Sequence, residues 1–388
     1  MQFIPGIELS RRYFHEAVEP VLAAAWPGLR YGAALIGYGS EVQGFDDAMS
    51  TDHNWGLRVL LFLRADDLAA LGGEVWARLE AGVPDAFLDW PTRIDIDDAT
   101  ARDAGPDGRR PAALRIEIHA LADWVRSWLG VDAGRDPDWR AWLGLAEQGL
   151  IEVTAGAVFR DDLGELAALR ERLAYFPRDV WLHKLACQWT RIGQEQAFIG
   201  RTADLGDDLG SRILTARLAR DVMRLAFLVE RRYAPYPKWF GSAFARLASA
   251  AAIGPLLAAA LRADDRRERE AGIAGAAFRL AELHLRLGHP GALKPRLSTF
   301  SEMVRRPGDP PPWNDVATTR DFTVINADDL AAAVRAEIAD PEIRALAPVG
   351  AVDQFSDSTD LLEWPRLTLA AAAAVSLDRD ARTRPPRG

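Results

Sequence analysis

The stretch that decides the fold runs from Leu35 to Leu63 and reads LIGYGSEVQGFDDAMSTDHNWGLRVLLFL. Two apolar runs, at residues 31–38 and 55–63, enclose a polar segment that is rich in glycine and acidic residues. Short apolar runs bounded by glycine and polar residues are typical of buried strands. The pattern therefore predicts two strands that are joined by a long polar loop.

The polar segment carries residue types that bind phosphate and metal ions. Gly39 allows the backbone to approach a ligand closely. Ser40 supplies a hydroxyl group and is expected to open a helix, whose free N–H groups suit a phosphate. Asp52 and Asn54 are two residues apart at the expected start of the second strand, so both side chains should point to one face. Such a pair of oxygen ligands can hold a divalent cation.

A third carboxylate would complete this site. The alternating run at residues 114–119 (LRIEIH) predicts a half-buried strand, and Glu117 on it is well placed to join the two earlier ligands. Acidic residues that hold metal ions in this way are typical of phosphoryl and nucleotidyl transfer, in which the ions stabilise the attacking and leaving oxygens. Asp95 is the competing candidate, although it also fits a polar loop after Pro91.

Two other phosphate-binding motifs begin in the same segment, and both fail. Gly37-x-Gly39 begins like a dinucleotide fingerprint, but Val42 stands where the third glycine should be. Gly39 and Gly44 have the spacing of a phosphate loop, but Phe45 replaces the required lysine. The combined Gly-Ser, Gly and Asp-x-Asn spacing between two apolar runs is the more specific signal.

This spacing resembles the motif of the nucleotidyltransferase superfamily that includes aminoglycoside adenylyltransferases and polymerase-β-like enzymes. Longer phrases, among them GSEVQGFDD, QWTRIGQEQAFIGR and ERRYAPYPKWFGSAF, resemble a bacterial nucleotidyltransferase-like family that carries a domain-of-unknown-function label. The resemblance implies a nucleotide-binding α/β domain joined to a helical domain. It implies no particular substrate.

One position departs from the superfamily motif. The superfamily has a carboxylate where this chain has Asn54, so Asp52 and Glu117 alone supply negative charge. An amide oxygen is a weaker ligand than a carboxylate for a hard cation. Asp46 and Asp47 in the preceding loop are candidates to compensate. Retained catalysis and lost catalysis both stay open at this point.

Helical periodicity dominates from about residue 122 onward. Residues 209–233, for example, carry apolar side chains at steps of three and four, which is an amphipathic stripe. The sequence therefore predicts an α+β chain in which a nucleotidyltransferase-like mixed sheet with helices (residues 1–125) precedes a larger α-helical domain (residues 126–377). Residues 378–388 are predicted to be a disordered tail.

The helical part also carries charged residues that suit a binding site. Three arginines share one predicted helix face: Arg217, Arg220 and Arg224. They either meet phosphates or form an ion-paired surface. Lys238 lies among aromatic residues and either contacts a nucleotide or flanks a packed aromatic cluster. Three acids either line a cleft or cap a helix: Asp353, Asp357 and Asp360.

Composition narrows the function classes. The formal net charge of −9 argues against a long nucleic acid as acceptor, because phosphate contacts dominate such affinity. One cysteine excludes an intrachain disulfide and fits a reducing compartment. The chain has no apolar run of about 20 residues and no signal peptide, so we expect a cytoplasmic protein without a membrane span.

The sequence thus predicts a metal-dependent nucleotidyltransferase that moves a nucleoside monophosphate from a nucleoside triphosphate to a hydroxyl acceptor, a small molecule. The predicted cofactor is Mg²⁺, and Glu117 or another acid is the predicted general base. The predicted nucleotide-binding residues are Gly39, Ser40, Gly44 and Lys238, and the predicted metal ligands are Asp52, Asn54 and Glu117. The alternatives are a catalytically silent nucleotide-binding or protein-interaction module, and a nucleotidyltransferase that acts on tRNA or protein. The sequence leaves the oligomeric state open.

Overall fold

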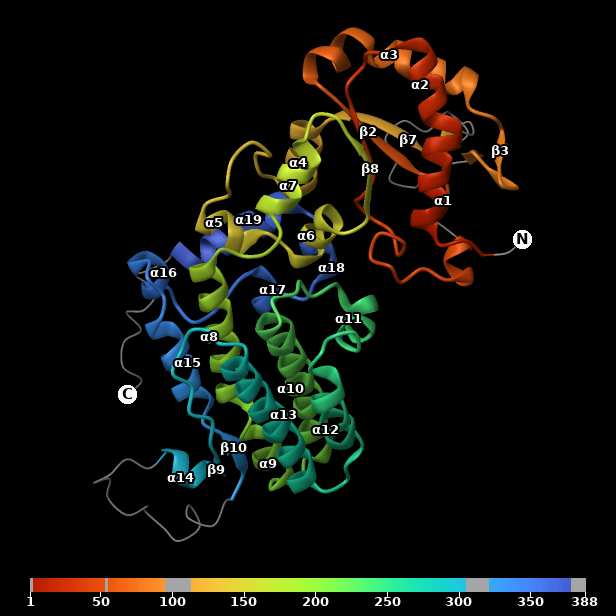
Figure 1. Cartoon of the computed structure of the whole chain (residues 1–388). Coiled ribbons are helices and arrows are strands. Elements are labelled where there is room, and N and C mark those ends of the chain that lie inside the picture. The colour runs from red at the N-terminus through yellow and green to blue at the C-terminus, as the bar shows by residue number, and fades with distance from the viewer. Residues whose placement is uncertain (1–2, 53–54, 95–112, 305–320, 378–388) are drawn as a thin grey trace. The chain divides into compact units, whose positions relative to one another are not determined.

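The computed structural model describes residues 3–52, 55–94, 113–304 and 321–377 (Figure 1). The chain forms two compact units. Unit 1 comprises residues 1–137 and 149–174, and unit 2 comprises residues 138–148 and 175–388. A mixed sheet and many helices make this an α+β chain, as predicted. The sequence predicted a domain boundary at residue 125, which differs from this division into units, and that boundary stays a prediction.

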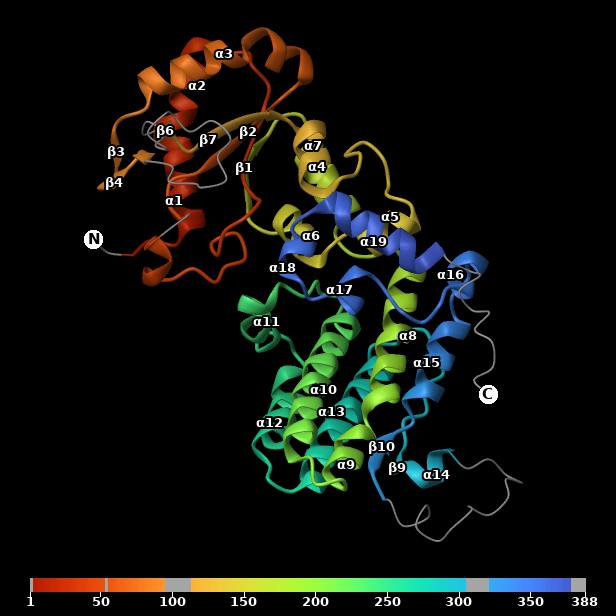
Figure 2. The same ribbon diagram turned by 180° about the vertical axis from the view of Figure 1, so that it is seen from behind.

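Unit 1 is built on a four-stranded sheet with the strand order β7-β2-β1-β8. The central strands β1 (Gly32–Leu35) and β2 (Val59–Leu63) are antiparallel and lie side by side in Figure 2. At the edges, β7 (Ile116–Ala120) is parallel to β2, and β8 (Ala157–Asp161) is antiparallel to β1. Strand β2 is buried along its whole length, which explains why it reads as a continuous apolar run.

The two faces of β2 pack against different helices. Its alternate residues Val59 and Leu61 share a core cluster with Leu9 and Phe14 of the N-terminal helical segment. Phe62 points to the other face and meets Trp124, with ring centroids 5.7 Å apart. The helices of unit 1 are α1 (Gly6–Tyr13), the π-helical turn η1 (Phe14–Val18), α2 (Glu19–Ala25), α3 (Ala65–Gly82), α4 (Leu121–Leu129) and α7 (Glu165–Arg172).

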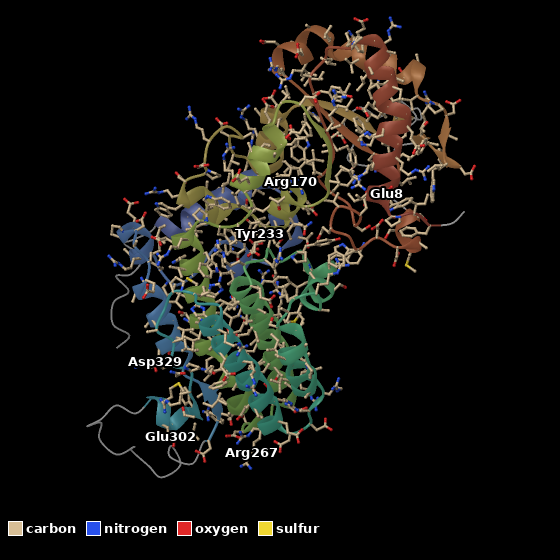
Figure 3. All side chains as sticks on the ribbon, viewed as in Figure 1. Glu8, Arg170, Tyr233, Arg267, Glu302 and Asp329 are labelled. Carbon is tan, nitrogen blue, oxygen red and sulfur yellow. The ribbon has the colours of Figure 1, made fainter. Side chains whose placement is uncertain are left out.

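Several short elements complete this unit. They are the 3-10 helix η2 (Ala48–Asp52), the strand pair β3 (Ala86–Phe87) and β4 (Trp90–Pro91), and the strand pair β5 (Arg93–Ile94) and β6 (Ala113–Leu114). Helix α6 (Glu147–Thr154) begins in unit 2 and ends in unit 1. Arg170 of α7, labelled in Figure 3, donates from Nε to the carbonyl oxygen of Thr154 at 3.1 Å and so holds the end of α6.

Unit 2 is mainly helical. Its longest helices, α8 (Arg178–Glu195), α10 (Asp208–Val229) and α13 (Arg266–Arg286), pack together, with α10 in contact with both others (Figure 1). Asp207 caps α10 by accepting the Gly210 amide at 2.8 Å. The remaining elements are α5 (Trp139–Gly144), α9 (Phe198–Ala203), α11 (Pro237–Phe244), α12 (Ala250–Arg262), α14 (Phe300–Val304), α15 (Ala327–Ala336), α16 (Pro341–Ala345), α17 (Val352–Phe355), α18 (Thr359–Leu362), α19 (Pro365–Leu377), β9 (Leu297–Thr299) and β10 (Thr323–Ile325).

The structure corrects one detail of the predicted elements. Strands β8, β9 and β10 lie in the part of the chain that was predicted to be helical. Each has five residues or fewer, which is shorter than the windows in which helical periodicity is recognised. The predicted tail at residues 378–388 lies outside the described residues. Within the described part of the chain, no helix combines the length and the apolar character that a membrane span requires.

Candidate functional site

The Gly39-Ser40 segment follows β1 and forms a turn. The Phe45 amide donates to the Ser40 carbonyl oxygen at 2.9 Å, and the Gly44 amide donates to the Glu41 carbonyl oxygen at 3.1 Å. The helix predicted to begin at Ser40 is wrong, because residues 40–44 close as turns and Gly44 has a φ of +68°, which ends any helical path. The amides of Gly39 and Ser40 donate to no residue that the structure describes. They therefore suit an anionic ligand.

A buried ion pair supports this turn from the protein interior. Glu41 is 1% exposed and Arg58 is 4% exposed. Arg58 donates from Nη2 to Glu41 Oε1 at 2.8 Å and to the Tyr38 carbonyl oxygen at 2.6 Å. At Gly39, which has a φ of +124°, an added Cβ would lie 2.5 Å from Glu41 Oε2 and 2.7 Å from Arg58 Nη2. Position 39 therefore requires glycine both for its backbone conformation and for space.

Glu117 lies on the strand next to β2, as predicted. It pairs with Leu60 in the parallel register, and its side chain is half-exposed. Its carboxylate is 2.9 Å from His119 Nε2. The pKa of Glu117 is lowered, first by this hydrogen bond and then by the positive charges of His119, Arg58 and Arg115, against the opposing effect of burial. Glu117 is therefore ionised at neutral pH and available to a cation.

A row of aromatic rings connects the turn with this strand. Tyr38 stacks on Trp128 with ring centroids 6.3 Å apart, and Trp128 stacks on Trp124 at 5.2 Å. Trp124 meets Phe62, whose ring centroid is 6.5 Å from that of His119. The turn and Glu117 are thus connected through continuous side-chain contacts within unit 1.

Asp52 and Asn54 are placed differently from the prediction. Asp52 is the last residue of η2, and β2 begins only at Val59, so Asp52 is not at the start of a strand. Asn54 lies outside the described residues, as does Asp95, and the side chain of Asp52 is not described. The metal-binding role of Asp52, Asn54 and Glu117 stays a prediction. Among the residues that the structure describes, no group of three or more His, Cys, Asp or Glu side chains could hold a metal ion.

The two acids considered as substitutes have structural roles. Asp46 Oδ2 accepts the Gly6 amide at 2.7 Å and Trp55 Nε1 at 3.0 Å. Asp47 Oδ1 accepts the Met49 amide at 2.9 Å at the start of η2. Both carboxylates therefore hold the loop in place.

The predicted residues of the second half of the chain lie in unit 2. Lys238 is exposed on α11, with Nζ 5.0 Å from the Trp239 ring centroid. Asp357 forms an ion pair with Arg220 at 3.3 Å, and the side chain of Asp360 on α18 is not described. The nucleotide-binding role of Lys238 stays a prediction.

A buried polar cluster surrounds Asp353. Its Oδ2 accepts the Glu147 amide at 3.1 Å, and the Glu147 carboxylate pairs with the fully buried Lys184 at 2.9 Å. Burial and the charge of Glu147 raise the pKa of Asp353 to about 6. Burial, with Glu147, also raises the pKa of Tyr233, which Figure 3 labels. These contacts explain why unit 2 tolerates several charged groups in its interior.

Sequence reasoning missed four residues of the candidate site in unit 1: Glu41, Arg58, Arg115 and His119. A signal for Arg58 was present, because it interrupts the apolar run WGLRVLLFL. A charged residue in a fully buried strand needs an opposite charge nearby. The identity of its partner, Glu41, follows only once β1 and β2 are paired.

No curated protein matches the sequence. A nucleotidyltransferase-like protein from Exiguobacterium sibiricum 255-15 is a structural neighbour with a TM-score of 0.31 and 11% sequence identity, over 77% of this chain and 84% of that one. Residues 142–240 match the model of a domain of unknown function, DUF4037. The resemblance to a family with such a label, predicted from the sequence, is thereby confirmed, and residues 142–240 carry the DUF4037 match.

Proposed function

We propose that this protein is a metal-dependent nucleotidyltransferase that moves a nucleoside monophosphate from a nucleoside triphosphate to the hydroxyl group of a small molecule. The observation that carries the proposal is the turn at Gly39-Ser40. Its free amides, its left-handed glycine and its support by the buried Glu41–Arg58 pair suit a phosphate group. Glu117 lies in the same sheet, on β7, which pairs with β2, the neighbour of β1.

The chemistry of the predicted ligands fits Mg²⁺. Asp52, Asn54 and Glu117 offer only oxygen atoms, which are the ligands that Mg²⁺ prefers. Glu117 is held ionised by His119 and by nearby arginines. When bound, Mg²⁺ would neutralise phosphate charge and stabilise the charge that develops during transfer.

The residues of the chain then have distinct roles in the proposed reaction. The turn binds and orients the phosphates through its amides, and Arg58 acts as a positioning residue through Tyr38 and Glu41. A carboxyl group with a lowered pKa is a poor proton acceptor, so Glu117 is better suited to hold a cation than to act as general base. The proton of the acceptor hydroxyl therefore goes to another group.

Calorimetric titration of the full chain with non-hydrolysable nucleoside triphosphate analogues, with and without Mg²⁺, tests the proposal. We expect magnesium-dependent binding that is lost in Asp52→Ala and Glu117→Gln. Asp123→Asn is the matched control, because Asp123 is an exposed acid of unit 1 that pairs only with Arg126 among described residues. Binding that is equally strong in Asp52→Ala would contradict the proposed site.

The silent alternative is tested with the same proteins. If the wild type binds no nucleotide analogue and Asn54→Asp does, the site has lost its chemistry through the substitution of its acid. If the wild type releases pyrophosphate and Asp52→Ala does not, the proposed activity stands. Label transferred from the nucleotide into RNA or protein would identify a macromolecular acceptor.

A further inference from the structure

Helix α10 of unit 2 carries two arginines, Arg220 and Arg224, one turn apart. Arg220 is half-buried, and Arg224 is 9% exposed. The pKa of Arg220 is lowered, first by burial and then by the positive charge of Arg224. Like charges one turn apart on a helix repel each other. The fold therefore holds two mutually repelling guanidinium groups together.

Arg224 is also short of partners. Its Nε is buried and has no hydrogen-bond partner, and no carboxylate in the described part of the chain forms an ion pair with it. The Cζ atom of its guanidinium lies 5.7 Å from the centroid of the Phe240 ring. A buried N–H group without a hydrogen-bond partner costs free energy, and an anion beside Arg224 would supply the missing acceptor.

Two acids lie near these arginines, and neither forms an ion pair with Arg224 among the described residues. Asp221 Oδ1 accepts from Arg191 Nε at 2.9 Å and from Gln188, while its Oδ2 is buried without a hydrogen-bond partner. Asp353 feels the charge of Arg224, but its Oδ2 accepts the Glu147 amide, and no ion pair joins it to Arg224 among the described residues. Neither acid is hydrogen-bonded to Arg224 in the described part of the chain, so its Nε remains without an acceptor.

The partner of Arg220 is easily displaced. Asp357 pairs with it at 3.3 Å, and the Asp357 side chain is 70% exposed. Exposed ion pairs contribute little free energy because water and salt screen them. A ligand that binds both arginines would therefore lose little by replacing Asp357.

We propose that Arg220 and Arg224 bind a phosphate group. A guanidinium presents two parallel N–H donors to an oxyanion, and two guanidinium groups match the double charge of a phosphate better than the single charge of a carboxylate. Both arginines belong to unit 2, whereas the residues of the proposed nucleotide site belong to unit 1. Its ligand is a phosphate ester or a free phosphate or pyrophosphate, which share this chemistry.

Titration of the full chain with inorganic pyrophosphate and with inorganic phosphate, in the presence of a metal chelator, tests the proposal. We expect Arg220→Gln to weaken binding by about tenfold or more, which corresponds to the loss of a charge-assisted hydrogen-bonded pair. Asp357→Asn should strengthen binding because it removes the competing acid. Arg217→Gln is the matched control, since Arg217 is on the same helix, is 51% exposed and pairs with Glu195 at 2.9 Å.

Arg224→Lys keeps the charge and removes the planar pair of donors, so it should bind more weakly than the wild type. Its fold is checked by circular dichroism, and Arg220→Gln serves if Arg224→Lys does not fold. The same titration in Asp52→Ala separates this site from the one in unit 1, and we expect unchanged affinity. The proposal is overturned if neither anion binds at concentrations on the order of 10 mM, if Arg220→Gln binds as the wild type does, or if Asp52→Ala abolishes binding. Equal competition by acetate would also overturn it.

Discussion

The buried pair of Glu41 and Arg58 gives a prediction whose size can be worked out. Arg58→Met keeps most of the length of the side chain and removes its charge. It leaves the Glu41 carboxylate, 1% exposed, without its cation, and it removes the hydrogen bond to the Tyr38 carbonyl oxygen. Removing one partner of a buried ion pair destabilises a protein by about 3–5 kcal/mol, because a buried charge is left uncompensated.

The double variant Glu41→Met/Arg58→Met removes both charges. Replacing a buried pair by apolar side chains is often neutral or stabilising, by up to about 4 kcal/mol. The double variant should therefore be more stable than Arg58→Met alone, with a coupling free energy of about 3 kcal/mol or more. It should nevertheless bind nucleotide poorly, since the turn at Gly39 loses the group that positions it.

Hydrogen exchange followed by mass spectrometry suits this experiment, because a chain with two compact units need not unfold in one step. Peptides from β1 and β2 should exchange about a hundredfold to a few thousandfold faster in Arg58→Met, at about 1.4 kcal/mol for each tenfold change. Peptides from α10 serve as the internal reference.

Two results would refute this reasoning. Unchanged exchange of β1 and β2 in Arg58→Met would mean that the ion pair does not stabilise the sheet. Exchange in the double variant that is as fast as in Arg58→Met would mean that the uncompensated charge is not the cause of the destabilisation.

Three further predictions follow from single contacts. His119→Leu removes the main cause of the lowered pKa of Glu117, so the carboxylate should protonate at a higher pH, and the pH midpoint of magnesium-dependent nucleotide binding, measured by calorimetry, should rise. Gly39→Ala should destabilise the turn by about 1–3 kcal/mol and abolish nucleotide binding. Gly73→Ala is the control, because an added Cβ there meets open space and should stabilise α3 by up to about 1 kcal/mol. Urea titration measures the stability of both variants, and calorimetry measures their nucleotide binding. The pKa of Asp353 is raised to about 6, so the folded state holds this proton more tightly than the unfolded state, and stability should fall as the pH rises from about 4 to about 6. Asp353→Asn should lack this decrease in a series of melting temperatures, and an unchanged pH profile would contradict the assignment.

The elements that sequence predicted well are those with a clear period or a long apolar run. The stripe of residues 209–233 became α10, and the runs at 31–38 and 55–63 became β1 and β2. Strand β8 was missed because its five residues, AVFRD, lie between helical stretches and have no sustained alternation. Its place in the sheet depends on pairing with β1, more than a hundred residues earlier, which local patterns do not encode.

The candidate site shows the same limit. Gly39 and Glu117 could be proposed as site residues from their positions relative to apolar runs, and their roles stay predictions. Motif spacing was not sufficient to select Glu41 and Arg58, which meet only after β1 and β2 form an antiparallel pair. The conformation of Ser40 was also mispredicted, because glycines at 39 and 44 with left-handed backbones favour turns over a helix.

The charges around Glu117 bear on how a metal ion would arrive. Arg58 and Arg115 both lower the pKa of Glu117, so both act on the same region of unit 1. With Asn54 in the motif, Asp52 and Glu117 are the only acids of the predicted ligand set, and two cations oppose them. A divalent cation without a nucleotide gains little electrostatic free energy where two acids are opposed by two arginines. A nucleotide brings phosphates that attract both the arginines and the metal ion. We therefore expect the metal ion to bind together with the nucleotide, and the neutral Asn54 to be compatible with that order of binding.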